Sequence, residues 1–551
     1  MTTGIDSLGR RFWRWRAVQQ PRSRDDLPRI TRPPGWLPDW RGPTVRRHRR
    51  ELAAFEQAIA ALPSTSTVAD VVDLALLGSA TARVRFELDV VRAWQRQPGF
   101  YVDQSIGVVY DALLPRPEWP SARRAAVLRG LRAVPGMLRE GLANLDGHVV
   151  PEFAAAAGRE LDQVEDQVTA TIGELREHFP PGSRAELTDA GTRAAAALGD
   201  YRRSLSTLRP GDFPGPLGAE GFAFFRHRVA LLPYDPDEMI ETGRAAFARA
   251  VRNEEEAATA VAAGRPAPAT TAEQIARHDH AERAVLAHYR DAGLLDLPGS
   301  LRGYRALPMP GYLMPLCWLA VTDDLGGCER PGDAVTYVPP VGHERGFFDL
   351  ANVRDARLGV LHEGAHAQQL ALSWTNPRPL RRRYYDSAPN EGIAFYNEEL
   401  LLRSGLLDDN PDARRAVWTF MRLRALRVEV DVGLALGRMT IEDAAGALAA
   451  GVPLDDATAR QEAAFFAATP GQGLSYQIGK TQIERLIAAA RERGHSPAEV
   501  HTWLWRNGNV PIALLRWELL GSRDELDRIG TPVMAGGKAN DSAAAEAENH
   551  D

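Results

Sequence analysis

Cysteine, lysine and long apolar runs are all scarce in this chain of 551 residues, and each scarcity excludes a class of protein. The 2 cysteines, Cys317 and Cys328, are too few for a disulfide framework. No stretch reaches the roughly 18 consecutive apolar residues of a membrane span. The beginning, MTTGIDSLGRRFWRWR, lacks the apolar core of a signal peptide. We therefore expect a soluble cytoplasmic protein without a membrane partner.

Basic residues are nearly all arginine, since Lys480 and Lys538 are the only lysines. The formal net charge is -6, which argues against a nucleic-acid partner because such proteins carry a basic surface. Hydrophobic residues make up 44% and charged residues 25% of the chain, as in globular proteins. A chain of this length exceeds one ordinary core, so we expect a large domain or several helical subdomains. The oligomeric state stays open.

The pattern of apolar residues, prolines and glycines divides the chain into four segments. Residues 1–45 form an N-terminal lead-in rich in Arg, Trp and Pro. Residues 46–293 form a helical subdomain, in which apolar residues recur at intervals of three and four. Residues 294–530 hold the motifs described below and are expected to form a metal-binding catalytic subdomain, with 531–551 a tail expected to be disordered. In the third segment we expect helices at about 412–436, 441–450, 457–468, 477–493 and 496–507.

A short strand is expected at 334–338, because Ala-Val-Thr-Tyr-Val has β-branched and aromatic residues within a region dense in Gly and Pro. One hypothesis makes it an edge strand beside the helix expected from about Asn352 to just before Pro377, called the metal helix below for the motif it carries. A substrate backbone would then pair with this strand. An ordinary short strand explains the pattern equally well.

The motif His-Glu-x-x-His, formed by His362, Glu363 and His366, is the strongest functional signal. Residues four apart lie on one face of an α-helix, so both imidazoles can bind one Zn²⁺, and the Glu can act on the metal's water. The alternative is a surface helix with two histidines at this spacing. We favour the metal because the surrounding residues are apolar on several sides, and polar groups buried there need partners. Asn352 is expected to cap this helix.

A second helix, beginning at Asn390, offers the carboxylate that would complete a His-His-Glu zinc set with one open position. Glu391 and Glu398 are seven residues apart and share a face. We assign Glu391 as the ligand, since Gly392 next to it leaves room for close approach to the metal helix. Glu398 is then expected to hydrogen-bond a ligating His and fix its tautomer.

Other polar residues near these motifs have open interpretations. The Arg run at 378–383 is expected to form a solvated face, with binding of a substrate carboxylate as the alternative. Lys480 is likewise expected either to face solvent or to bind a substrate carboxylate. The glycine-rich stretch 470–480 is expected to form a loop near the metal, because glycines at a helix start allow close backbone approach.

Four motifs, in this order, resemble a bacterial family known as domain of unknown function 885: LHEGAHAQQLAL, NEGIAFYNEE, PGQGLSYQIGK and NGNVP. The resemblance covers most of the chain. The family looks like a set of mostly helical zinc metallopeptidases related in shape to the thimet and neurolysin oligopeptidases. It implies a helical shell around a deep cleft, with a small sheet beside the metal helix and a gluzincin-like site. By motif match, His362, His366 and Glu391 are the expected ligands and Glu363 the general base.

These observations predict an enzyme that hydrolyses peptide or other amide bonds with one Zn²⁺ per chain. The tetrahedral oxyanion needs a hydrogen-bond donor beyond the metal, and Tyr476 is the first candidate, with His501 the second. The alternatives are a tyrosine at the edge of the core and a histidine on a helix surface. One alternative is a metalloenzyme recruited to non-peptide chemistry, acting on a small amide or ester in a biosynthetic pathway. Another is a binding scaffold that has kept the metal without catalysis, which the intact Glu363 argues against.

Overall fold

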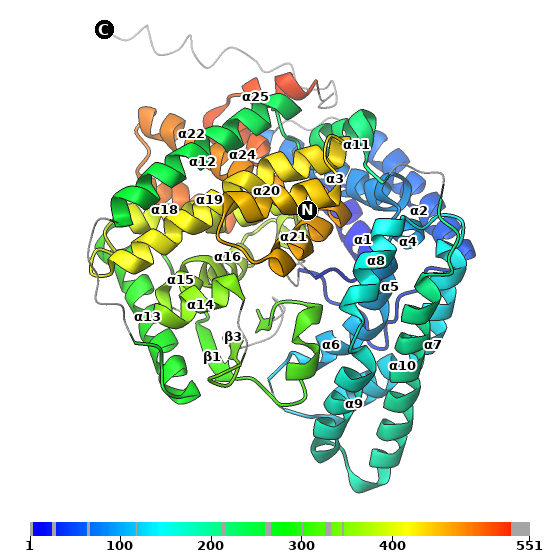
Figure 1. Ribbon diagram of the computed structural model, residues 1–551. Helices are drawn as coiled ribbons and strands as arrows, with labels where there is room; N and C mark the ends of the chain where they lie inside the picture. The colour runs from blue at the N-terminus through cyan, green and yellow to red at the C-terminus, as the bar shows by residue number, and fades with distance from the viewer. Residues whose placement is uncertain are drawn as a thin grey trace, which may run out of the picture.

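The computed structural model describes residues 4–24, 29–62, 67–116, 118–211, 215–258, 266–299, 301–325, 332–343 and 346–530. This part of the chain is mostly α-helical with one small sheet, which confirms the expected fold class (Figure 1). None of the helices in these ranges combines the length and apolar composition needed to cross a bilayer. The tail expected to be disordered lies outside the described residues.

The helices before the sheet fill the first part of the chain. They are α1 (Gly4–Gln19), α2 (Gly42–Ala60), α3 (Val68–Arg85), α4 (Ala93–Arg96), α5 (Pro98–Val102), α6 (Val108–Leu113), α7 (Ser121–Leu145), α8 (Pro151–Glu160), α9 (Val164–Leu175), α10 (Arg184–Leu205), α11 (Gly218–Phe224), α12 (Pro236–Ala258) and α13 (Thr271–Asp291). Three short π-helical segments lie among them: η1 (Phe86–Val91), η2 (Asp103–Gly107) and η5 (Phe225–Val229). Two 3₁₀ turns are η3 (Arg176–His178) and η4 (Pro181–Ser183).

The remaining elements carry the motifs. They are β1 (Tyr304–Pro308), η6 (Met314–Leu319), β2 (Asp323–Asp324), β3 (Ala334–Val338), α14 (Phe347–Arg354), α15 (Arg357–Gly359), η7 (Val360–Gly364), α16 (Ala365–Ser373), α17 (Pro379–Arg383), α18 (Ser387–Arg403), α19 (Pro411–Leu436), α20 (Ile441–Gly451), α21 (Asp456–Ala468), α22 (Gln472–Glu492), α23 (Pro497–Arg506), α24 (Ile512–Leu520) and α25 (Asp524–Ile529). All five helices expected after residue 411 are present. The fourth, α22, begins five residues earlier than predicted, so the glycine-rich stretch forms its first turns.

The sheet has three strands in the order β1-β3-β2. β1 pairs in parallel with β3, from Tyr304 opposite Ala334 to Pro308 opposite Val338, and β2 pairs with β3 in antiparallel fashion. The strand expected at 334–338 is confirmed with these bounds, but the edge-strand hypothesis is wrong. β3 is central, because β1 and β2 take up hydrogen-bonding groups on its two sides.

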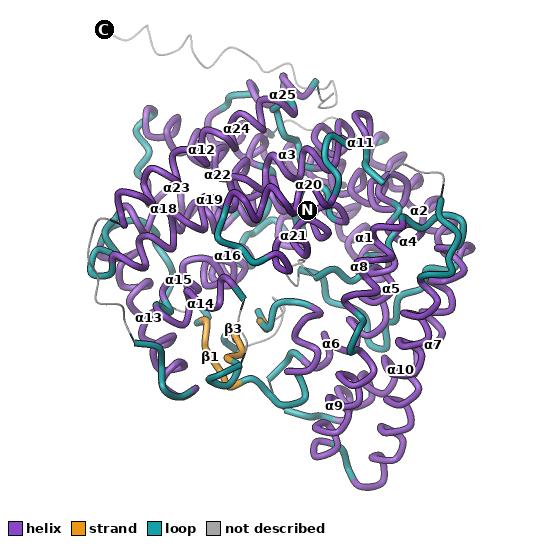
Figure 2. The backbone as a smooth tube through the Cα atoms, in the orientation of Figure 1, coloured by secondary structure: helices purple, strands orange, loops and turns teal. Residues whose placement is uncertain are grey.

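Two features of the fold position the site. The ring of Tyr304 in β1 lies against Gly364 at the end of η7, where an added Cβ would come within 3.5 Å of the ring, so the sheet adjoins the metal helix. A large hydrophobic cluster continues from α1 to α25 and contains Leu361 beside the first motif His. Figure 2 shows the strands beside α13, with helices making up most of the rest. The division at residue 293 and the deep cleft remain predictions.

Candidate metal centre

The metal helix is continuous from Arg357 to Ser373 but changes its winding at the motif. His362 and Glu363 lie in the π-helical segment η7, and His366 lies in the α-helical part that follows. Single π turns within α-helices occur frequently at functional sites. Although the helix is buried on most sides, Glu363 is only partly buried. The π turn was not predicted, because the sequence pattern of one such turn does not differ from that of an α-helix.

The cap of this helix differs from the prediction. Asn352 lies inside the separate helix α14, which ends because Asp355 adopts an extended conformation with φ -140. The carboxylate of Asp355 accepts a hydrogen bond from the backbone N–H of Arg357 at 3.1 Å and another from Asn410 at 2.8 Å. Asp355 therefore accepts the N–H of the first helical residue and places a carboxylate near the positive end of the helix dipole, while the N-cap residue itself is Ala356.

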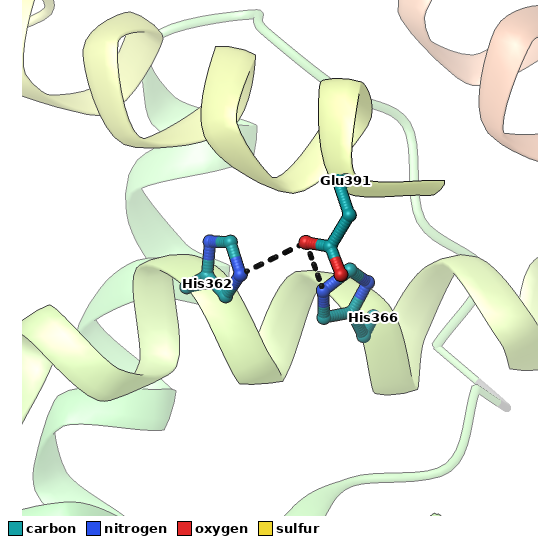
Figure 3. Close-up of side chains that lie close together, drawn as sticks. All are labelled: His362, His366 and Glu391. Atoms are coloured by element: carbon teal, nitrogen blue, oxygen red, sulfur yellow. Dashed lines mark ion pairs between the residues drawn. The ribbon is translucent and has the colours of Figure 1, made fainter. Parts of the chain in front are cut away.

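The side chains of His362, His366 and Glu391 converge on one point (Figure 3). The Oε2 atom of Glu391 lies 3.3 Å from Nε2 of His362 and 3.5 Å from Nε2 of His366. The three residues are 8%, 5% and 7% exposed. Their ligand atoms all lie within 4.8 Å of one another, and they are the one His/Cys/Asp/Glu set with this property in the part of the chain that is described.

This donor set fits a metal ion. Among the described residues no hydrogen-bond donor in good geometry satisfies Oε2 of Glu391, although the atom is buried. Burial raises the pKa of the Glu391 carboxyl, but His362 and His366 lower it well below its usual range. The site therefore favours a positive charge between a carboxylate oxygen and two imidazole nitrogens, which is the ligand chemistry of Zn²⁺.

Glu398 contacts the imidazole of His362 at the ring nitrogen that does not face Glu391. Its Oε1 lies 2.7 Å from Nδ1 of His362, and the guanidinium of Arg424 lies 2.9 Å from the same carboxylate. Burial and Arg424 both lower the pKa of His362, yet the carboxylates of Glu391 and Glu398 outweigh them and raise it to about 9. Because Nδ1 is held by Glu398, the other ring nitrogen points to Glu391. The placement is the one expected from the seven-residue spacing.

Gly392 permits a close approach, but to a different helix from the one expected. A Cβ at Gly392 would lie 2.7 Å from the carbonyl carbon of Gly479 in α22, and a Cβ at Gly479 would lie 1.9 Å from the carbonyl oxygen of Ala388. The two glycines thus let α18 and α22 cross with their backbones in contact. The helix α18 also begins at Ser387 rather than Asn390, with its N-terminus capped by Asp386. Glu391 therefore lies one turn inside the helix.

Tyr476 is beside the cluster, and His501 is elsewhere in the fold. The ring of Tyr476 stacks on that of His362, with centroids 6.2 Å apart and planes at 19°. His501 in α23 has Nδ1 at 2.7 Å from the carbonyl oxygen of Leu294 and Nε2 at 2.9 Å from the hydroxyl of Tyr396. Burial lowers the pKa of His501. With both ring nitrogens engaged in these contacts, His501 has the surroundings of a structural histidine.

Both predictions for Lys480 are wrong. It lies inside α22, is fully buried, and forms an ion pair with Glu399. Its Nζ lies 4.7 Å from the ring centroid of Phe395. Neither a solvated lysine nor one free to meet a substrate has these surroundings. A buried ammonium needs a carboxylate partner, and Glu399 reaches it where α18 crosses α22, with Glu484 of α22 itself at 3.9 Å.

The prediction of a solvated Arg face is wrong for Arg381, which is buried, whereas Arg378 is partly exposed. Arg381 is 2% exposed and bonds to Asp73 at 2.7 Å and Glu518 at 2.8 Å. Arg378 bonds to Asp73 at 2.6 Å. These residues fasten the segment before α18 to α3 and α24, so their role is structural.

Three polar residues near the cluster were not predicted. Gln472 has its Nε2 at 3.4 Å from Oε1 of Glu391, and it lies within the glycine-rich motif, which was a usable signal. Arg424 and Arg427 are both buried in α19. No local pattern distinguishes these two from the many other arginines of the chain.

Residues 33–304 and 326–519 match the family described as "Bacterial protein of unknown function (DUF885)". The chain belongs to this family. The match covers most of the described residues, including the metal helix and α18, and it confirms the resemblance of the four motifs. No curated protein matches the chain.

Two solved structures share the fold of this DUF885 member. One is "the putative lipoprotein from Colwellia psychrerythraea", with a TM-score of 0.71 and 15% identity, covering 96% of this chain and 100% of the other. The other is "a putative lipoprotein of unknown function from Shewanella oneidensis", with a TM-score of 0.66 and 13% identity, covering 94% and 99%. At these identities the likeness concerns the fold.

Proposed function

We propose that this DUF885 member is a zinc-dependent hydrolase of peptide or other amide bonds, with the metal chemistry expected from its resemblance to thimet-type metallopeptidases. The observation that carries the proposal is the convergence of two Nε2 atoms and one buried carboxylate oxygen, Oε2 of Glu391, which lacks a hydrogen-bond partner among the described residues. His362, His366 and Glu391 would hold one Zn²⁺. A bound zinc ion polarises a carbonyl and lowers the pKa of a water molecule.

Glu363 has the position of the general base. It follows the first ligand directly, and it is only partly buried while the residues flanking it are buried. Its carboxylate would accept a proton from the attacking water as the new C–O bond forms and gives a tetrahedral species. It would then donate that proton to the leaving nitrogen as the C–N bond of the amide breaks. The two roles need one carboxylate that reaches solvent and is not itself a ligand.

Tyr476 is the proposed donor to the oxyanion that develops on the substrate carbonyl. Its ring stacks on the ligand imidazole, so a group at the metal lies within the surroundings of this side chain. A hydroxyl that is already oriented stabilises charge as it appears, without reorganising at that moment.

The test is a cleavage screen with the zinc-loaded full chain, using a peptide library beside a panel of small amides and esters. We expect cleavage of peptides or amides by the parent. The Glu363→Gln variant keeps the shape of the side chain and should retain zinc, but its turnover should fall by about 10²-fold or more. Turnover at the parent rate in a zinc-containing Glu363→Gln variant would contradict the mechanism. Activity confined to the small molecules would instead favour the non-peptide alternative.

A further inference from the structure

Tyr476 is packed against two buried guanidiniums as well as the ligand His362. The guanidinium carbons of Arg424 and Arg427 lie 5.5 and 5.0 Å from the centroid of the Tyr476 ring. The two arginines are 5% and 4% exposed, whereas Tyr476 is partly exposed. They are three residues apart on α19, so both project from one face of that helix.

Each guanidinium is oriented by one carboxylate. Arg424 bonds to Glu398, the residue that also supports His362. Arg427 bonds to Glu462 through two nitrogens, at 2.8 and 2.5 Å, which is the planar bidentate geometry that fixes a guanidinium most firmly. Arg424 therefore helps to hold the proposed ligand His362 through Glu398. Among the described residues, Arg427 forms no hydrogen bond or ion pair with a proposed ligand, so its effect on Tyr476 can be tested separately.

Arg427 also lies near two further aromatic rings. Phe466 and Phe348 have centroids 5.2 and 5.8 Å from its guanidinium carbon. Such rings attract the cation through their faces but accept no strong hydrogen bond. The orientation of Arg427 thus depends on Glu462, and Arg427 in turn supplies a fixed positive charge against the face of Tyr476.

We propose that Arg427, anchored by Glu462, is a positioning residue that holds Tyr476 against His362 for donation to the oxyanion. This inference rests on the proposed hydrolase function for its catalytic consequence. The structural part, that Arg427 sets the placement of the Tyr476 ring, does not depend on turnover. The alternative is that Arg427 only fills the core between α19 and α21.

The first arm of the test measures the placement of the ring without any substrate. The full chain is labelled with 3-fluorotyrosine, and the ¹⁹F resonance of Tyr476 is assigned by its loss in Tyr476→Phe. We expect this resonance to move or broaden in Arg427→Gln and to stay in place in Arg422→Gln. Arg422 is a matched control, because it lies on the same helix, bonds to Glu254 at 3.0 Å, and stacks on Phe247 instead.

The second arm measures kcat and KM with the peptide that the zinc-loaded parent cleaves fastest. The Arg427→Gln variant should lose roughly 3- to 30-fold in kcat, the range of one buried cation–ring contact, with a smaller change in KM. In the Tyr476→Phe background the same change should have almost no further effect, since residues that act as a unit are not additive. Arg427→Lys, which keeps the charge but lacks the fork, should recover part of the loss.

The outcomes separate the two proposals. An unmoved ¹⁹F resonance in Arg427→Gln, or losses of kcat that multiply in the double variant, would overturn the positioning role. A parent that cleaves nothing would instead remove the hydrolase function, while the ¹⁹F result still decides whether Arg427 places Tyr476. If Arg427→Gln does not fold, Glu462→Gln removes the anchor and keeps the arginine. The same ¹⁹F shift, smaller in size, is then expected.

Discussion

At the residue scale, Glu391 and Glu398 have different partners that define different roles. The carboxylate of Glu391 faces two imidazole nitrogens, whereas that of Glu398 bonds to Nδ1 of His362 and to Arg424. Replacing Glu391 by Ala removes a ligand and should weaken zinc binding more than the same change at Glu398, where roughly 10–100-fold is expected. Competition with a chelator measures both affinities. A larger loss in Glu398→Ala would reverse the assignment.

The residues of the site differ in how far the sequence predicts them. The spacing of His362 and His366 is local, so one helical face follows directly from it. Glu391 could be predicted because it lies in the motif NEGIAFYNEE, one of the four that resemble the family. The buried pairs of Lys480 with Glu399 and of Arg424 with Glu398 were not, since they join helices distant in the sequence. From the sequence alone, a charged side chain is expected to face solvent, because a partner on a distant helix comes beside it only in the folded chain.

At the element scale, the crossing of α18 and α22 positions the site, because α18 carries Glu391 and α22 carries Tyr476. A methyl group at Gly479 would collide with the carbonyl oxygen of Ala388, a backbone atom that cannot move aside alone. We expect Gly479→Ala to lower the free energy of unfolding by about 1–3 kcal/mol and to weaken zinc binding. Thermal unfolding and chelator competition measure these effects.

The control for this change is Gly446→Ala in α20, where an added Cβ meets no atom within 4 Å. That substitution should stabilise the protein by roughly 0.5–1 kcal/mol, since alanine is the better helix former. A fully stable Gly479→Ala variant with unchanged zinc affinity would show that the two helices can separate without disturbing the site.

The five helices predicted after residue 411 followed from apolar periodicity and capping residues, and four of them agree within a residue at each end, whereas α24 and α25 were not predicted. The start of α22 was not predicted either, because Gly471 and Gly473 suggested a loop. Gly471 does adopt a left-handed conformation with φ +95, but Asp431 accepts hydrogen bonds from the N–H groups of Gly471 and Leu474. That cap, from a different helix, allows α22 to begin at Gln472.

At the scale of the whole molecule, buried histidines should make stability depend on pH. His278 is 9% exposed, and burial lowers its pKa to about 4. Between about pH 6.5 and 4 the unfolded chain binds a proton at this position that the folded protein does not. Stability is therefore present above pH 6.5 and is lost as the pH falls, by up to about 3 kcal/mol from this one residue.

Chemical denaturation at several pH values, with chelator present so that metal release plays no part, measures this loss. The His278→Gln variant should lose less stability than the parent between pH 6.5 and 4. His343→Gln, at an exposed loop position, serves as the control and should behave as the parent. If the parent and His278→Gln lost the same free energy of unfolding between pH 6.5 and 4, His278 would not contribute to the acid sensitivity.

The most direct test of the central claim is the zinc content of the purified full chain and of its ligand variants, measured by elemental analysis after dialysis against zinc and then against metal-free buffer. The convergence of His362, His366 and Glu391 predicts about one zinc per chain in the parent and in Glu363→Gln. It predicts loss of that zinc in His362→Ala and in His366→Ala. Full zinc occupancy in both histidine variants, or none in the parent, would contradict the metal centre.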